Sequence, residues 1–106
     1  MKCMNAFGLR EGMQDEYKRR HDEIWPEMET LMLRAGLRNY TIWNVGTRLI
    51  EYYECDDPEA SARLIHAEPV KARWDAYMKD ILVFGERGET FPLACVFEFN
   101  SMEREA

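Results

Sequence analysis

Residues 39–55, NYTIWNVGTRLIEYYEC, indicate a β-hairpin near the middle of the chain. Its two halves, NYTIWNVG and RLIEYYEC, are rich in the β-branched and aromatic residues that strands favour, and VGTR between them is a turn signal. The fold class then depends on the segments that flank this hairpin on either side.

Stretches of helical periodicity lie on both sides of the hairpin. The first begins at EGMQDEY, residues 11–17, and runs to about Ala35, with Gly36 as a typical helix stop. The second covers residues 56–82 and begins with Asp and Pro, which is a helix-entry signal. Pro69 is expected to split this second stretch into two segments, because a proline interrupts a helix.

Strand-like segments lie at both ends of the chain, over residues 3–10 (CMNAFGLR) and 93–100 (LACVFEFN), and GERGETFP, residues 85–92, is predicted to be a loop. The order is therefore β-α-β-β-α-β, the ferredoxin-like arrangement. It predicts one α+β domain over residues 1–106, with a four-stranded antiparallel sheet that carries both helices on one face.

Both faces of the predicted strands are substantially apolar, whereas a sheet with one solvated face alternates more cleanly. In the second strand, for example, Tyr40 and Ile42 point away from Trp43 and Val45. The second face is therefore predicted to meet another subunit or to enclose an apolar pocket. We favour a homodimer with facing sheets, which is a dimeric α/β barrel.

The composition argues against several classes of partner. The 106 residues include 14 Lys and Arg against 20 Asp and Glu, for a net charge of -6. Binding to a phosphate backbone requires clustered positive charge, so no nucleic-acid partner is expected. The sequence has no apolar run of membrane-spanning length and no signal-peptide pattern, which predicts a cytoplasmic protein without membrane association.

Motifs that would indicate a cofactor are missing from the sequence. It has no Gly-rich phosphate loop, no paired-histidine motif and no cysteine spacing for zinc, so no metal, nucleotide or other cofactor is expected. Cys3, Cys55 and Cys95 are odd in number, widely spaced and within apolar segments. We interpret them as buried free thiols rather than as a disulfide or metal framework.

EYKRRHDEIWPEMETLML, residues 16–33, contains a candidate site around His21, one of two histidines in the chain. Tyr17, His21 and Trp25 are four residues apart, so they share one face of a helix and can line an apolar pocket with polar tips. Pro26 fits termination and restart of the helix, and a kink there would widen the space beside His21. Core packing explains the same pattern, because aromatic residues at helical spacing usually pack.

Three segments carry a resemblance to a known family: EYKRRHDEIWPEM, NYTI and RWDAYM, in this order. They resemble the signature of the L-rhamnose mutarotase family, and the similarity spans nearly the whole chain. It implies a dimeric ferredoxin-like fold and the interconversion of the α and β anomers of a 6-deoxy monosaccharide. The resemblance places the catalytic histidine at His21, substrate-contacting tyrosines at Tyr17 and Tyr40, and a tryptophan platform at Trp74.

Three departures from the family pattern fall at the end of the site that is expected to select the sugar. Asp75 follows Trp74 where a second tryptophan is common, EASARLIH lacks a further tryptophan, and VFGERGETFP replaces a polar, proline-containing loop. A carboxylate accepts hydrogen bonds from adjacent hydroxyls, so Asp75 suggests activity on L-fucose at least comparable to that on L-rhamnose. An exposed Asp75 without a role is an equal alternative, because most Asp side chains are exposed.

The chemistry of mutarotation suits a histidine. Opening the ring moves one proton onto the ring oxygen and one off the anomeric hydroxyl, and a group that titrates near neutrality can do both. Two other interpretations stay open. One is a cofactor-free monooxygenase or haem-binding protein of the dimeric α/β-barrel type, with His21 or His66 as axial ligand. The other is a non-catalytic sugar-binding module. If the protein is a mutarotase or a sugar-binding module, we interpret His66 as structural or exposed.

Overall fold

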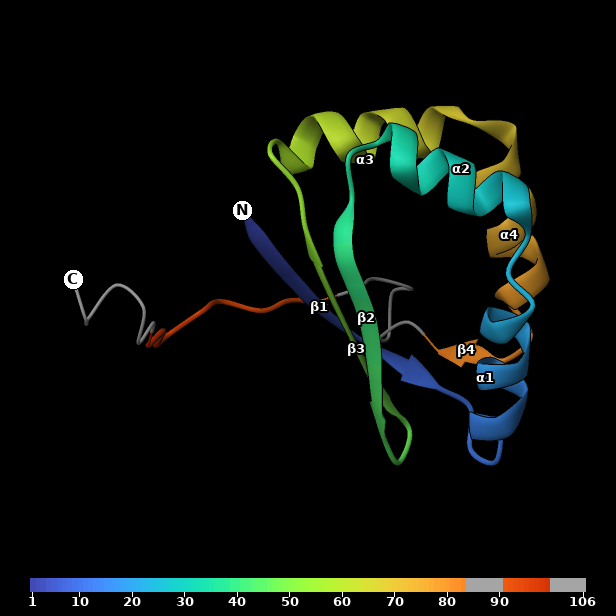
Figure 1. Ribbon diagram of the computed structural model, residues 1–106. Coiled ribbons are helices and arrows are strands. Elements are labelled where there is room, and N and C mark those ends of the chain that lie inside the picture. Colours follow the sequence, from blue (N-terminus) through green and yellow to red (C-terminus); the bar gives the residue numbers. More distant parts are fainter. Residues whose placement is uncertain (84–90, 100–106) are drawn as a thin grey trace.

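The computed structural model describes residues 1–83 and 91–99. Its elements, in chain order, are β1 (Lys2–Leu9), α1 (Gln14–Asp22), α2 (Pro26–Arg34), β2 (Arg38–Val45), β3 (Arg48–Glu54), α3 (Pro58–Ala67), α4 (Pro69–Met78), β4 (Leu82–Val83) and β5 (Phe91–Pro92). Figure 1 shows the helices gathered on one side of the sheet. Within the described residues, none of the helices has the length and apolar character needed to cross a membrane.

The strands form one antiparallel sheet in the order β2-β3-β1-β4, and β5 also pairs with β1. This is the ferredoxin-like α+β arrangement that the order of elements predicted. In the register, Glu51 of β3 lies between Asn5 of β1 and Ile42 of β2, and Leu49 lies opposite Phe7. Because side chains alternate along a strand, this register assigns all five of these residues to the helix-covered face.

Prolines divide each helical stretch into two helices, as predicted for Pro26 and Pro69. Both residues occupy the first turn of their helices, where a backbone N–H would have no acceptor within the helix, so its absence in proline costs no hydrogen bond. The preceding residues, Trp25 and Glu68, are extended, with ψ angles of 135° and 132°, because the proline ring excludes a helical conformation there. Trp25 therefore lies outside α1. The prediction that Tyr17, His21 and Trp25 share one helix face is wrong for Trp25, because α1 ends at Asp22.

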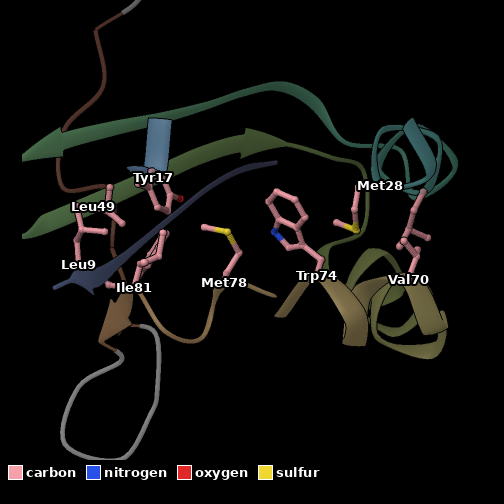
Figure 2. Close-up of a cluster of buried hydrophobic side chains, with 10 residues drawn as sticks. Leu9, Tyr17, Met28, Leu49, Val70, Trp74, Met78 and Ile81 are labelled. Carbon is pink, nitrogen blue, oxygen red and sulfur yellow. The ribbon is translucent and has the colours of Figure 1, made fainter. Parts of the chain in front are cut away.

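The hydrophobic core lies between the sheet and the helix layer. In Figure 2, Leu9 and Leu49 project from the sheet, and Trp74 and Met78 project from α4 into the same cluster. Each of these side chains is at most 7% exposed, and burying a side chain of this size contributes about 1.5–3 kcal/mol. Trp74 is therefore a core residue as well as part of the cavity described below.

The predicted last strand over residues 93–100 is wrong for its described part. Residues 93–99 have no regular secondary structure, and the neighbouring strand β5 contains only Phe91 and Pro92. The register limits how far pairing of this segment with β1 could extend. Asn5 pairs with Pro92, so continued antiparallel pairing would already place Lys2, the first residue of β1, opposite Cys95. Beyond that point no strand in the described part of the chain continues beside the segment.

Two smaller expectations also need correction. Leu82, predicted to end the second helical stretch, instead forms β4 with Val83 and pairs with β1. All three cysteines are free thiols, but only Cys55 is buried, Cys3 is partly exposed and Cys95 is exposed. The loop predicted over residues 85–92 lies outside the described residues up to residue 90, and its last two residues, Phe91 and Pro92, form β5 instead.

Candidate active site

A cavity of about 910 Å³ lies between the helix-covered face of the sheet and the helices. Its volume falls in the range of small-molecule sites, about 300–1,000 Å³. The side chains that matter for its chemistry are Asn5, Tyr17, His21, Tyr40, Glu51, Tyr53 and Trp74, and the lining also includes Lys18, His66 and Lys71.

His21 is held in a defined orientation in this wall. It lies in the last turn of α1, where its Nδ1 is 3.2 Å from the carbonyl oxygen of Tyr17. A carbonyl oxygen only accepts hydrogen bonds, so in the neutral ring Nδ1 carries the proton and Nε2 keeps its lone pair. The imidazole also stacks on the Tyr17 ring, with 4.3 Å between centroids, and meets Trp74 edge to face at 5.4 Å.

The surroundings of His21 keep it uncharged. Burial lowers the pKa of His21 below its usual value of 6.5, and the hydrogen bond to Tyr17 and the nearby carboxylates of Asp22 and Glu51 oppose this only in part. A lowered pKa means that the imidazole is neutral at pH 7. His21 can therefore accept a proton at Nε2 under physiological conditions.

Three tyrosines bring hydroxyl groups to the cavity. Burial raises the pKa of Tyr17 and Tyr40, and the charge of Glu51 raises both further. Burial likewise raises the pKa of Tyr53 to about 12. The rings of Tyr40 and Tyr53 stack at 5.7 Å. All three hydroxyls keep their protons at neutral pH, so each can donate a hydrogen bond to a ligand or to a neighbouring residue.

Glu51 is a cavity residue that the sequence pattern did not single out. Its Oε1 accepts a hydrogen bond of 3.0 Å from Asn5 Nδ2, and its Oε2 accepts one from the Tyr40 hydroxyl. A signal for this was present in RLIEYYEC, because Glu51 shares the inward register of Leu49 and Tyr53. A charged residue in the inward register of a strand is a marker of a site.

Trp74 and Trp25 pack together at one side of the cavity. Their rings meet edge to face at 5.1 Å, and Trp25 also stacks on Tyr77 at 5.4 Å. Trp74 lines the cavity, whereas Trp25 is absent from its lining and supports Trp74 from behind. Trp25 is therefore a packing residue rather than a wall of the cavity.

Asp75 lies apart from the other predicted site residues. Its side chain is 53% exposed and pairs with the Lys71 ammonium on the preceding turn of α4, with 2.5 Å between Nζ and Oδ1. It does not belong to the cavity lining, which does contain Lys71 and the exposed His66. The structure thus brings together four of the five predicted residues, His21, Tyr17, Tyr40 and Trp74, and leaves Asp75 in solvent.

Comparisons with known proteins show the family of the chain. The family model described as L-rhamnose mutarotase matches residues 2–99. An L-rhamnose mutarotase from Rhizobium johnstonii is 37% identical over 83 residues, which cover 70% of this chain and 71% of the relative.

Solved structures show the same fold. The crystal structure of an L-rhamnose mutarotase from Formosa agariphila aligns with a TM-score of 0.80 at 22% identity, covering 94% of this chain and 99% of that one. A dimeric ferredoxin-like protein from an uncultured marine organism aligns with a TM-score of 0.64 at 17% identity, covering 94% and 99% of the two chains. Together with the match over residues 2–99, these findings show that the chain belongs to the L-rhamnose mutarotase family, whose enzymes are isomerases of sugar anomers.

Proposed function

We propose that the protein interconverts the α and β anomers of L-rhamnose, with His21 as the proton carrier. The observation that carries this proposal is the neutral imidazole in the cavity wall, whose Nδ1 bonds to the Tyr17 carbonyl and whose Nε2 is left as a base. The cavity also combines an apolar wall for a methyl group with hydroxyls and a carboxylate for the sugar hydroxyls. Family membership supports the same reaction.

The reaction needs only a transfer of protons around one carbon. Nε2 of His21 accepts the proton of the anomeric hydroxyl while the bond between C1 and the ring oxygen breaks. The imidazolium then delivers that proton to the ring oxygen, which was bonded to the same carbon, so one nitrogen serves both oxygens in turn. The open-chain aldehyde rotates about its C1–C2 bond and closes on the other face by the reverse steps.

The two candidate sugars differ in how the structure supports them. Asp75, the residue that would favour L-fucose, has an exposed side chain paired with Lys71. Without Asp75 in the cavity, L-rhamnose is the substrate that family membership favours. L-fucose keeps the 6-methyl group and is the second candidate.

We also infer a homodimer that forms through the uncovered face of the sheet. Large apolar side chains lie exposed on that face, among them Trp43 at 67% and Val45 at 68%, with Met4 and Val83 on neighbouring strands. An apolar patch of this kind favours association. The fold is shared with a protein described as dimeric and ferredoxin-like.

Exchange NMR on the anomeric protons tests the function directly. With a catalytic amount of protein, saturation of one anomeric resonance of L-rhamnose should transfer to the other faster than in buffer, and more slowly for L-fucose. Binding of L-rhamnose without faster exchange would favour a non-catalytic sugar-binding module. Equal or faster exchange of L-fucose would reverse the order of the two sugars.

A further inference from the structure

Glu51 is a carboxylate at the centre of the cavity floor. It lies on β3, with Asn5 of β1 on one side and Ile42 of β2 on the other, below the helices that carry His21 and Trp74. Neither its position nor its chemistry is needed for the proton transfer assigned to His21.

Two neutral donors fix the orientation of this carboxylate. Asn5 Nδ2 donates to Oε1 over 3.0 Å, and the Tyr40 hydroxyl donates to Oε2. Tyr40 is in turn held by its stacking on Tyr53 at 5.7 Å. The carboxylate is therefore pre-organised before any ligand binds, which lowers the entropy cost of using it in recognition.

The charge of Glu51 is not neutralised by a cation in the described part of the chain. The ion pairs there involve other carboxylates, and the two lysines of the cavity lining, Lys18 and Lys71, pair with Asp22 and Asp75. A partly buried carboxylate without a cationic partner is costly unless it gains strong hydrogen bonds. Hydroxyl groups of a bound sugar would supply them.

The carboxylate has room for further donors. An ionised carboxylate offers about four lone-pair positions, and the Asn5 and Tyr40 hydrogen bonds use two of them. We propose that Glu51 is a sugar-binding residue that accepts hydrogen bonds from ring hydroxyls through its remaining lone pairs and so orients the sugar below His21. The proposal rests on the mutarotase function and adds to it a recognition group on the opposite wall of the cavity.

A matched control lies on the same strand. Glu54 also accepts hydrogen bonds from a tyrosine and an asparagine, over 2.5 Å from Tyr52 and 3.0 Å from Asn39. It lies on the face of the sheet away from the cavity and is absent from the cavity lining. Glu51→Gln and Glu54→Gln therefore each remove one negative charge from β3, in similar hydrogen-bond surroundings. Only the first of the two residues lines the cavity.

The test measures sugar affinity and anomer exchange together. NMR titration with L-rhamnose should show that Glu51→Gln weakens binding about fivefold and Glu51→Ala at least about tenfold, since hydrogen bonds to a charged group are among the stronger ones. Glu54→Gln should stay within about twofold. The exchange rate at saturating sugar should change by less than about threefold in Glu51→Gln, because the lost contacts are equal in the ground and transition states.

A second comparison separates contact from positioning. If Glu51 acted only by holding Tyr40, then Glu51→Gln would have no effect in a Tyr40→Phe background. Direct binding predicts a further loss of about threefold or more in that background. Thermal unfolding of each variant checks that the fold is kept, and Glu51→Gln, which has the same size as glutamate, carries the conclusion if Glu51→Ala does not fold.

The outcomes of this experiment distinguish the two proposals. Exchange in the wild type together with unchanged affinity in Glu51→Gln overturns the role of Glu51 and leaves the mutarotase function standing. Affinity that depends on Glu51 but without any exchange supports Glu51 and overturns the function. Absence of both binding and exchange overturns both.

Discussion

The two faces of the sheet carry the same trio of residue types in different surroundings. On the covered face and on the uncovered face of β3, a glutamate accepts hydrogen bonds from a tyrosine and an asparagine: Tyr40, Glu51 and Asn5 inside, and Tyr52, Glu54 and Asn39 outside. The residue types and contacts are nearly the same. What differs is the layer above them, because only the inner trio shares a cavity with an imidazole.

This difference shows where function resides in the molecule. A shift of one residue along a strand exchanges the two faces, so the alternation of β3 decides which glutamate meets a ligand. The covered face combines core and cavity, while the uncovered face is apolar at Trp43 and Val45 without helices to cover it. The covered face should therefore control stability and catalysis, and the uncovered face should control association.

The largest effect should come from truncating the covered face. Phe7→Ala, at a β1 side chain that is 7% exposed, should lower the free energy of unfolding by about 3–5 kcal/mol, because it leaves a cavity in the core. In the separated subunit, Met4→Ala, on the uncovered face of the same strand, should lower it by less than about 1 kcal/mol, because this side chain is 39% exposed there. Urea unfolding followed by circular dichroism measures both. Equal losses would mean that the two faces are buried alike.

An added charge on the uncovered face should dissociate the proposed dimer without unfolding the subunit. Trp43→Glu replaces an apolar ring that is 67% exposed with a group that resists burial. Light scattering should then report a monomer mass where the wild type gives a dimer mass. Leu33→Glu is the matched control, since Leu33 is exposed on α2 and lies away from this face. A monomeric wild type, or a Trp43→Glu dimer, would contradict the proposed interface.

The pH dependence of exchange should be smaller and should report on His21. Burial lowers the pKa of His21 below 6.5, so the neutral, proton-accepting form persists to more acidic pH than for a free imidazole. After subtraction of the buffer rate, exchange should stay near its maximum from pH 8 to about pH 7.5 and should become half-maximal only below pH 6.5, as the pH drops through the lowered pKa. A half-maximal rate at pH 7 or above would show that burial does not control this group.

The sequence predicted the elements whose signals are local. Prolines and glycines mark helix ends through backbone geometry, so the starts at Pro26 and Pro69 and the stop at Gly36, with φ of +79°, were readable from the sequence. Tyr17 and His21 were placed together because residues four apart share a helix face. Tyr40 and Trp74 come from distant segments, and it was the family resemblance rather than any local pattern that joined them to His21.

The features that the sequence did not reveal depend on partners elsewhere in the fold. LACVFEFN has an apolar pattern typical of a strand, but a strand also needs a partner strand. Because β1 begins at Lys2, it could pair with this segment only as far as Cys95. Asp75 was a candidate by its place beside Trp74, yet on a helix the next residue points about 100° away. Glu51 was overlooked because a charged residue in a strand is usually assigned to the solvent face.

The central claim is that His21, rather than the cavity in general, carries the proton. The most direct measurement compares anomer exchange of L-rhamnose in the wild type, His21→Ala and His66→Ala, the last of which changes the other, exposed histidine. His21→Ala should lose about 100-fold or more of the protein-dependent rate, the usual scale of general acid–base catalysis, with sugar binding still detectable, and His66→Ala should stay within about threefold of the wild type. A His21→Ala variant that is folded, binds L-rhamnose and exchanges its anomers as fast as the wild type would contradict the account.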